Sequence, residues 1–498
     1  MGTTNKKDRE NSMKSRCAYG FADIYGGGAF VVISTFYTVF LTKALGMPPA
    51  LAGTIPLFGK IWDAITDPLM GNIADRTKSR FGAKRFYLLI GSIISALTFL
   101  LMWVAFPGGS MTGKYLFYLL MYILFSTGFT IVMVPYNALL PDMVEDYTIR
   151  SRFSGTRIIF SSFGSILAGL IPTLIITDNT DAGAYFKVAL LFAVLFLIVI
   201  LLTFAGTWEK QKPVVKIGFK DSFVQSLSVF RGKSFQLFIL IFLCGQGAAD
   251  FVTGLAVYYI DDVLNSYGGG HFTMLMGVIL VSQLVGTILF SVIMPKTSKK
   301  FPLLVGFPVR IVATLALLLI SYEGANFFIM LGLSFIIGLG MAGSSTTIYA
   351  ILADMGDVDE LVTSIDRKGT VSAMATFARK IATGLSSTVI GILLAIVGYD
   401  ETIAAAGGRQ SAATQQGIAI VYVLAPVILM VAAWFATKAF PVTGTELAVI
   451  QKEIARRKGE DDSEITDEER KVCEAVTGFA YDRLWNPENA LSLKADKK

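Results

Sequence analysis

Apolar residues fill long stretches of this sequence, and short polar segments separate them. The plainest stretch runs from Val188 to Thr207 without a charged residue. An α-helix of about 20 apolar residues crosses a hydrocarbon core roughly 30 Å thick and satisfies its own backbone hydrogen bonds. The pattern therefore predicts an all-α membrane protein with twelve transmembrane helices. We expect them at residues 18–43, 50–73, 86–106, 115–140, 153–176, 184–207, 234–260, 272–294, 302–321, 326–352, 370–397 and 417–439.

Basic residues gather in every second segment between these helices. Lys and Arg are dense at 6–16, 76–85, 150–152, 210–233 and 296–300, whereas 176–184 has none. Short cytoplasmic loops retain Lys and Arg, so both termini are predicted to be cytoplasmic.

The polar segment near 209–233 divides the helices six and six, which is typical of transporters built from two halves around a central site. We expect a cytoplasmic N-terminus at 1–17, a first six-helix half at 18–207, a cytoplasmic middle loop at 208–233, a second half at 234–439 and a cytoplasmic tail at 440–498. Within the tail, Thr466 to Glu469 has the pattern of a helix capping box.

Composition narrows the possible functions. The chain is 54% hydrophobic and 16% charged, and its net charge of +6 is spread over loops, which indicates a lipid bilayer and no nucleic-acid partner. The three cysteines lack metal-ligand spacing, and the single histidine, His271, falls in a predicted loop. Nucleophile, zinc and phosphate-loop motifs are absent, so we expect neither an enzyme nor a cofactor.

The second predicted helix carries three charges, Lys60, Asp63 and Asp67. Each costs roughly 2.5 to 3.5 kcal/mol at the centre of a lipid-exposed helix. Together they outweigh the apolar residues of the same helix, so they are expected to face protein or a water-filled cavity.

Asp63 and Asp67 lie four residues apart, which places both carboxylates on one helical face where they could share one ligand. Two close carboxylates repel each other, so the pair is expected to bind a cation or keep a proton. The alternative is a structural salt bridge between Lys60 and Asp63, which would leave Asp67 without a partner. On the eleventh helix, Arg379 or Lys380 is expected to reach these acids.

Other polar residues in apolar helices are candidates for solute binding. Gln246 and Asp250 on the seventh helix, and Ser344 to Thr347 on the tenth, offer the donors and acceptors that sugar hydroxyls require. Hydrogen bonding between helices is the alternative for the hydroxyls. Gly26 to Gly28, after Asp23, indicate either a flexible point or close helix packing.

Several motifs resemble one known family. They are Tyr19-Gly20-Phe21, the run Gly59 to Gly71 with the string W-D-A-x-x-D-P-x-x-G, and the run Asp75 to Gly82, followed by Pro135, Arg157, Ala353-Asp354 and Lys380. Over about residues 15 to 450 the sequence resembles the glycoside-pentoside-hexuronide:cation symporters, the melibiose-permease branch of the major facilitator fold. This resemblance implies two six-helix halves.

The resemblance also implies a cation site. The positions that match the family's site are Asp63, Thr66, Asp67, Thr130 and Lys380. If the ion is Na⁺, Asp63, Asp67 and Thr130 would be its ligands. The melibiose carriers commonly have Asn where this chain has Thr66, so both Na⁺ and H⁺ stay open.

For the sugar, the resemblance implies a rebuilt pocket. Two family aspartates are replaced by Gly27 and Met133, and two aromatic positions by Asn137 and Ser345, whereas Arg157 and Thr376 are kept. The loss of two acids favours an acidic sugar paired with Arg157 or Lys380. Asp23 and Asp250 favour a neutral sugar instead.

The expected function is therefore symport: inward movement of Na⁺ or H⁺ coupled to uptake of a sugar, glycoside or hexuronide by a monomer in the cytoplasmic membrane. One alternative is a transporter-like sugar sensor or scaffold that signals through its tail. Another is a membrane enzyme acting on lipid-linked sugar, which would need a base near a nucleophile or metal.

Overall fold

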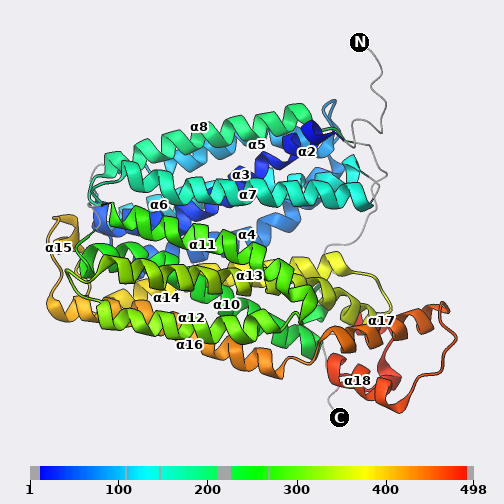
Figure 1. The fold of residues 1–498 in the computed structure, drawn as a ribbon. Coiled ribbons are helices and arrows are strands. Elements are labelled where there is room, and N and C mark those ends of the chain that lie inside the picture. The colour runs from blue at the N-terminus through cyan, green and yellow to red at the C-terminus, as the bar shows by residue number, and fades with distance from the viewer. Residues whose placement is uncertain (1–11, 107–108, 145–146, 210–225, 267–269, 491–498) are drawn as a thin grey trace.

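The computed structural model describes residues 12–106, 109–144, 147–209, 226–266 and 270–490. Every regular element in these ranges is a helix (Figure 1), which confirms the predicted all-α fold. Most of the predicted N-terminus, much of the middle loop and the last eight residues of the tail lie outside the described residues.

The described residues of the first half form nine helical elements. They are α2 (Met13–Gly20), α3 (Ala22–Val32), η1 (Ile33–Tyr37), η2 (Phe40–Ala44), α4 (Pro49–Arg76), α5 (Ala83–Leu101), α6 (Met111–Met143), α7 (Tyr147–Ile175) and α8 (Ala182–Gly206). The first predicted helix is thus a succession of α2, α3 and two π-helical segments, with a break at Phe21.

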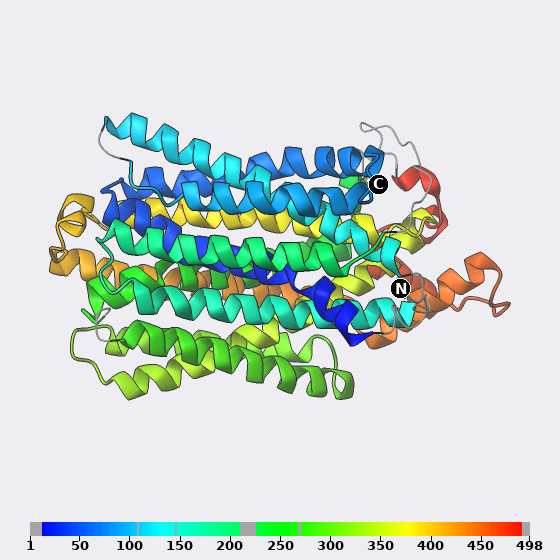
Figure 2. The same ribbon diagram turned by 90° about the horizontal axis from the view of Figure 1, so that it is seen from above.

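The second half follows the same plan. Its elements are η3 (Ser228–Arg231), α10 (Lys233–Tyr258), η4 (Tyr259–Val263), α11 (His271–Ile293), η6 (Met294–Lys296), α12 (Phe301–Ala316), η7 (Leu317–Ile320), α13 (Phe327–Thr363), α14 (Lys368–Ile396), α15 (Glu401–Ala405) and α16 (Ala412–Ala439). Figures 1 and 2 show the two bundles side by side, with their helices running in nearly the same direction.

Among the described residues, eleven helices are long and apolar enough to cross a membrane. α4 is not in this set, although it has 28 residues, and it is the helix that carries Lys60, Asp63 and Asp67. The predicted number of twelve spans therefore stays a prediction.

One boundary and one additional helix differ clearly from the prediction. α13 continues to Thr363 instead of ending at 352, because its charged last turns find partners: Lys299 pairs with Asp354, and Arg367 pairs with Asp359. The short helix α15 was not predicted, because five residues are too few to show the regular spacing of apolar residues that indicates a helix.

The two halves meet at the end of the bundle that holds α15, which we call the far end. Thr42 and Tyr258 share a hydrogen bond of 2.7 Å there, and the Lys43 ammonium lies 2.7 Å from both Asp261 and Asp262. The opposite end carries the basic loop between α4 and α5, and we call it the basic end.

Glycines allow α3 and α7 to touch. A Cβ on Gly27 would lie 2.7 Å from the carbonyl oxygen of Ser161, and a Cβ on Gly164 would lie 2.6 Å from that of Ile24. Close packing, one of the two interpretations of Gly26 to Gly28, is therefore present at Gly27.

The tail folds onto the basic end of the second half (Figure 1). It contains α17 (Gly444–Lys458), α18 (Asp467–Thr477), η8 (Tyr481–Arg483) and η9 (Pro487–Ala490). The capping box at Thr466 is confirmed. The backbone N–H of Trp485 donates to the carbonyl of Leu361 at 2.8 Å, which satisfies an acceptor at the end of α13 that a helix cannot satisfy itself.

Candidate functional site

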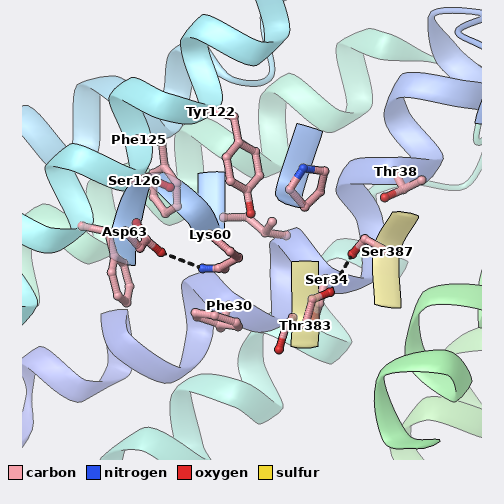
Figure 3. Close-up of a pocket in the computed structure, with 13 residues that line it drawn as sticks. Phe30, Ser34, Thr38, Lys60, Asp63, Tyr122, Phe125, Ser126, Thr383 and Ser387 are labelled. Carbon is pink, nitrogen blue, oxygen red and sulfur yellow. Dashed lines mark hydrogen bonds and ion pairs between the residues drawn. The ribbon is translucent and has the colours of Figure 1, made fainter. Parts of the chain in front are cut away.

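The charges of α4 lie inside the bundle, as predicted. Asp63 is 1% exposed and Lys60 is 6% exposed. The Lys60 ammonium lies 3.1 Å from Oδ2 of Asp63 (Figure 3) and 4.2 Å from the centre of the Phe30 ring. Oδ1 of Asp63 is buried and has no hydrogen-bond partner among the described residues. A buried carboxylate oxygen of this kind can accept a proton or coordinate a cation.

Asp67 is held from the two neighbouring helices. The Thr130 hydroxyl on α6 donates to its Oδ1 at 2.7 Å, and Lys380 on α14 forms an ion pair with its Oδ2. The expectation that a cation of the eleventh helix reaches the acids is confirmed, with Lys380 as the partner. The alternative salt bridge between Lys60 and Asp63 is also present. The expectation that it would leave Asp67 without a partner is wrong.

The two carboxylates therefore do not share a ligand in this arrangement. Each has its own lysine, one from the same helix and one from the other half of the protein. The predicted position Thr66 lies next to Asp67, where its hydroxyl donates to the carbonyl of Trp62 at 3.0 Å.

Close packing of α4 on α14 brings Lys380 to Asp67. A Cβ on Gly384 would lie 2.8 Å from the Cα of Leu57, so the two backbones touch at this glycine. Gly384 follows Lys380 by four residues, which places both on one face of α14. A larger side chain at Gly384 would separate the acid from its lysine.

A pocket adjoins the acids on their far-end side, between the two halves (Figure 3). It encloses about 510 Å³ of space, open solvent included. Its lining residues are Phe30, Ile33, Ser34, Thr38, Pro56, Lys60, Asp63, Tyr122, Phe125, Ser126, Phe129, Thr383 and Ser387. Aromatic rings, with Ile33 and Pro56, thus form the apolar part of the wall, and hydroxyls with one ion pair form the polar part.

The hydroxyls of this pocket were not predicted from the sequence. They come as three pairs four residues apart: Ser34 with Thr38, Tyr122 with Ser126, and Thr383 with Ser387. That spacing places both members of a pair on one helical face, so polar pairs in apolar helices were the signal that could have found them.

Asp250, one of the predicted solute-binding residues, lies beside this pocket. It lines a second, adjoining space together with Ser34, Thr38, Thr383 and Ser387. Both of its oxygens accept hydrogen bonds from Arg379, at 2.6 and 2.7 Å. Arg379 therefore pairs with the seventh helix and not with the acids of α4.

Asp23 and Arg157 form a further ion pair, between α3 and α7. Nε of Arg157 donates to one carboxylate oxygen, and Nη2 donates to the other at 3.3 Å. The guanidinium lies 4.9 Å from the centre of the Tyr136 ring. Arg157 and Lys380, the expected partners of an acidic sugar, are thus both engaged by aspartates.

The remaining predicted solute positions do not gather around the pocket. Gly27 faces α7, and Met133 is 7% exposed. Asn137 and Thr376 are exposed, and the hydroxyl of Ser345 donates to the carbonyl of Met341 at 2.7 Å. None of these five lines the pocket as the described residues form it.

Asp63 and Asp67 can bind a hard monovalent cation. Two carboxylates and the Thr130 hydroxyl supply only oxygen ligands, which hard cations prefer. The described part of the chain holds no group of three or more His, Cys, Asp or Glu arranged for a metal ion.

The chain is similar to curated bacterial transporters over nearly its whole length. It is 27% identical over 437 residues to the uncharacterized symporter YjmB of Bacillus subtilis, covering 86% of this chain and 92% of the relative. It is 24% identical to the inner membrane symporter YicJ of Escherichia coli, covering 92% and 98%. It is 26% identical to the glucuronide carrier protein homolog of Escherichia coli, covering 92% and 99%.

Solved structures share the fold. A bacterial homolog of the human lysosomal transporter Spinster, inward-facing and unoccupied, aligns with a TM-score of 0.63 at 14% identity, covering 88% of this chain and 98% of that one. A D-xylose-proton symporter aligns with a TM-score of 0.56 at 15% identity, covering 83% and 96%. These likenesses confirm the major facilitator fold.

The family match extends through both halves. Residues 18–444 match the family described as MFS/sugar transport protein. With its many apolar helices and bacterial symporter relatives, the chain is a multi-pass protein of the inner membrane. It belongs to the MFS/sugar transport protein family, as its resemblance to the glycoside-pentoside-hexuronide:cation symporters predicted.

Proposed function

We propose that this protein is a secondary active symporter that couples inward movement of Na⁺ or H⁺ to uptake of a sugar, glycoside or hexuronide. The observation that carries the proposal is the pair Asp63 and Asp67, held between the two halves beside a pocket lined by hydroxyls. The membership of the family and the symporter names of the relatives support it.

The coupling ion competes with a lysine in this proposal. The ammonium of Lys380 neutralises Asp67, and that of Lys60 neutralises Asp63. A cation or proton that reaches the acids releases one of these lysines and also satisfies the unpartnered Oδ1 of Asp63. Because Lys380 belongs to the other half, its release changes how the halves are held together. Ion binding and the arrangement of the halves are thus linked equilibria.

The solute binds in the pocket next to the acids. A sugar has hydroxyls on its edge and an apolar face, which suit the hydroxyl pairs and the aromatic rings of the wall. Ser34 and Tyr122 belong to the first half, whereas Thr383 and Ser387 belong to the second. A solute that contacts both halves favours the arrangement in which they close around it.

Alternating access then follows from opening and closing the two ends. With the basic end in the cytoplasm, the far-end contacts Thr42–Tyr258 and Lys43–Asp261 close the outer side. Rocking of the halves would break these contacts and open the pocket outward. In this scheme the protein works as a monomer, performs no covalent reaction and needs no cofactor besides the coupling cation.

Uptake into proteoliposomes tests the proposal. The purified protein is reconstituted, a Na⁺ or H⁺ gradient is imposed, and accumulation of a panel of labelled glycosides and uronides is measured. Asp63→Asn and Asp67→Asn are expected to abolish accumulation against the gradient, because each removes a carboxylate that binds the ion. Asp178→Asn, in an exposed far-end turn, removes the same charge away from the site and is expected to leave accumulation unchanged. Unchanged accumulation in both α4 variants would refute the proposal.

A second candidate is a membrane sugar sensor that signals through its tail. The observation that favours it is the docked tail, where Ser234 of α10 donates to the carbonyl of Val476 at 2.5 Å and Lys458 pairs with Glu360 at 2.6 Å. Movement of α10 or α13 would therefore reach the tail directly. Removal of the residues after Phe440 separates the candidates, because a symporter still accumulates solute when the truncated protein folds.

A further inference from the structure

Arg310 is a buried cation of the second half that plays no part in the proposed symport. It lies in the middle of α12 and is 0% exposed. All three nitrogens of its guanidinium are buried, and none has a hydrogen-bond partner among the described residues. A guanidinium stays charged at neutral pH and carries five N–H donors. Both the charge and the donors therefore need a partner.

Three other helices of the second half pack on α12 near this side chain. A Cβ on Gly340 of α13 would lie 2.8 Å from the Cβ of Arg310. Within two turns of Arg310, Phe307 packs against Gly245 of α10, and the indole of Trp434 on α16 donates to a backbone carbonyl of α12 at 3.2 Å. Arg310 is thus inside the second half, and it is not among the residues that line the pocket between the halves.

The acids of these four helices are engaged elsewhere. α12 and α16 contain no Asp or Glu, and Asp250 of α10 pairs with Arg379. The acids of α13 begin at Asp354, and each pairs with a lysine or arginine at the basic end. A buried charge without a counter-ion is strongly destabilising. The counter-ion of Arg310 is therefore expected to come from solution.

A hydroxyl and an unfilled space accompany the guanidinium. Thr314 lies four residues after Arg310 on the same face of α12, and its buried hydroxyl also lacks a hydrogen-bond partner in the part of the chain that the structure describes. Gly306, four residues before Arg310, is buried as well. A Cβ on Gly306 would meet one described atom within 4 Å, the carbonyl oxygen of Gly340 at 3.9 Å. Side chains thus leave part of this interface unfilled.

Donors that lack acceptors suit an anion. A water molecule needs acceptors for its own hydrogens, whereas a halide accepts from every donor and also cancels the charge. Because the guanidinium is fully buried, the ion has to be small. We propose that the second half binds one chloride-sized monovalent anion at Arg310, with the Thr314 hydroxyl as a further donor. This anion resides in the second half and is not the transported solute, so the inference goes beyond the proposed symport.

Chloride binding to the purified full-length protein tests the inference. Equilibrium dialysis with radioactive chloride is carried out at constant sodium, with gluconate as the replacing anion because gluconate is too large for a buried site. The wild type is expected to bind one chloride per chain. Its melting temperature is expected to rise by about 2 °C or more when chloride replaces gluconate, because an ion that binds only the folded state stabilises that state.

Three variants locate the site. Arg310→Met keeps a side chain of similar length and is expected to bind no chloride and to melt at the same temperature in both anions. In gluconate it should match or exceed the wild type, because an apolar group replaces an unpaired buried charge. Arg409→Met removes an exposed far-end arginine that pairs with Glu323, and is expected to bind chloride like the wild type. Thr314→Val removes the hydroxyl and is expected to weaken chloride binding about tenfold.

Two results would overturn the inference. If the wild type bound no chloride, the space beside Arg310 would hold internal water only. If folded Arg310→Met kept the bound chloride, the anion would bind elsewhere in the protein. Should Arg310→Met fail to fold, Thr314→Val carries the same comparison, and unchanged chloride affinity in that variant would overturn the assigned site.

Discussion

The Asp67 carboxylate on α4 and the Lys380 ammonium on α14 form an ion pair that joins the two halves of the protein. The other carboxylate oxygen accepts a hydrogen bond of 2.7 Å from Thr130 on α6, so both oxygens of Asp67 are engaged. An ion that binds to Asp67 must therefore compete with a contact between the halves. The free energy of ion binding and the free energy of opening are coupled through this one carboxylate.

Lys380→Gln is predicted to bind the coupling ion more tightly while losing accumulation. Removal of the ammonium ends its competition for Asp67, and a gain of about tenfold in ion affinity corresponds to about 1.4 kcal/mol. The amide cannot re-form the ion pair, so binding no longer changes the contact between the halves. Titration of the purified protein with Na⁺ or H⁺, followed by the fluorescence of Trp62 on α4, measures the affinity. Weaker ion binding in Lys380→Gln would contradict competition.

The Lys60–Asp63 pair allows a direct test against a purely structural role. Breaking a buried pair by removing one partner costs about 3 to 5 kcal/mol, whereas replacing both partners by apolar residues is often neutral. Lys60→Met with Asp63→Leu is therefore predicted to fold with nearly wild-type thermal stability and to lose accumulation. The matched control, Lys299→Met with Asp354→Leu, replaces a pair at the basic end and is predicted to keep accumulation. Accumulation by the α4 double variant would show that this pair only packs the helix.

The apolar pattern predicted the spanning helices well, because runs of bilayer length have few alternative structures. It failed where other forces set the boundary. The end of α13 depends on distant cations such as Lys299 and Arg367. The π-helical segments η1 and η2 could not be predicted, because they do not change the spacing of apolar residues in the sequence.

The site was predictable in part. Spacing along one helix placed Asp63 and Asp67 on one face, but spacing cannot show that Lys380, 313 residues after Asp67, completes the pair. The resemblance supplied Lys380 and Thr130. It did not supply the hydroxyls at Thr383 and Ser387, because they lie beyond the positions that matched the family's motif.

Close approach of α3 and α7 is predicted to depend on Gly164. A Cβ at this position would lie 2.6 Å from the carbonyl oxygen of Ile24, so Gly164→Ala forces the helices apart at a cost of about 1 to 3 kcal/mol. Gly155, on the same helix, has no neighbouring atom within 4 Å of its Cβ position among the described residues, and Gly155→Ala is predicted to be neutral or slightly stabilising. Thermal unfolding in detergent measures both. Equal melting temperatures for the two variants would contradict the close contact.

Within the tail, α18 is predicted to loosen from α17 in acid through Glu469, which pairs with Lys452 and Arg456 of α17. The backbone N–H of Thr466, the Arg456 guanidinium and the Lys452 ammonium lower the pKa of Glu469 to about 2. An acid whose pKa is lower in the folded state stabilises the fold above its unfolded value of about 4.3, and this contribution is lost as the pH falls toward 2. The packing of α18 against α17 is therefore predicted to loosen between about pH 4 and pH 2.

Cys473, one turn after Glu469 on α18 and fully buried, reports this transition. With Cys17 and Cys244 replaced by serine, reaction of Cys473 with 4,4′-dithiodipyridine, which modifies thiols in acid, is predicted to accelerate below pH 4. Glu469→Gln removes the charge and is predicted to give fast reaction already at neutral pH. Glu468→Gln changes the exposed neighbour and is predicted to react as slowly as the parent. Equal rates in the two Gln variants at neutral pH would show that Glu469 does not hold α18 against α17.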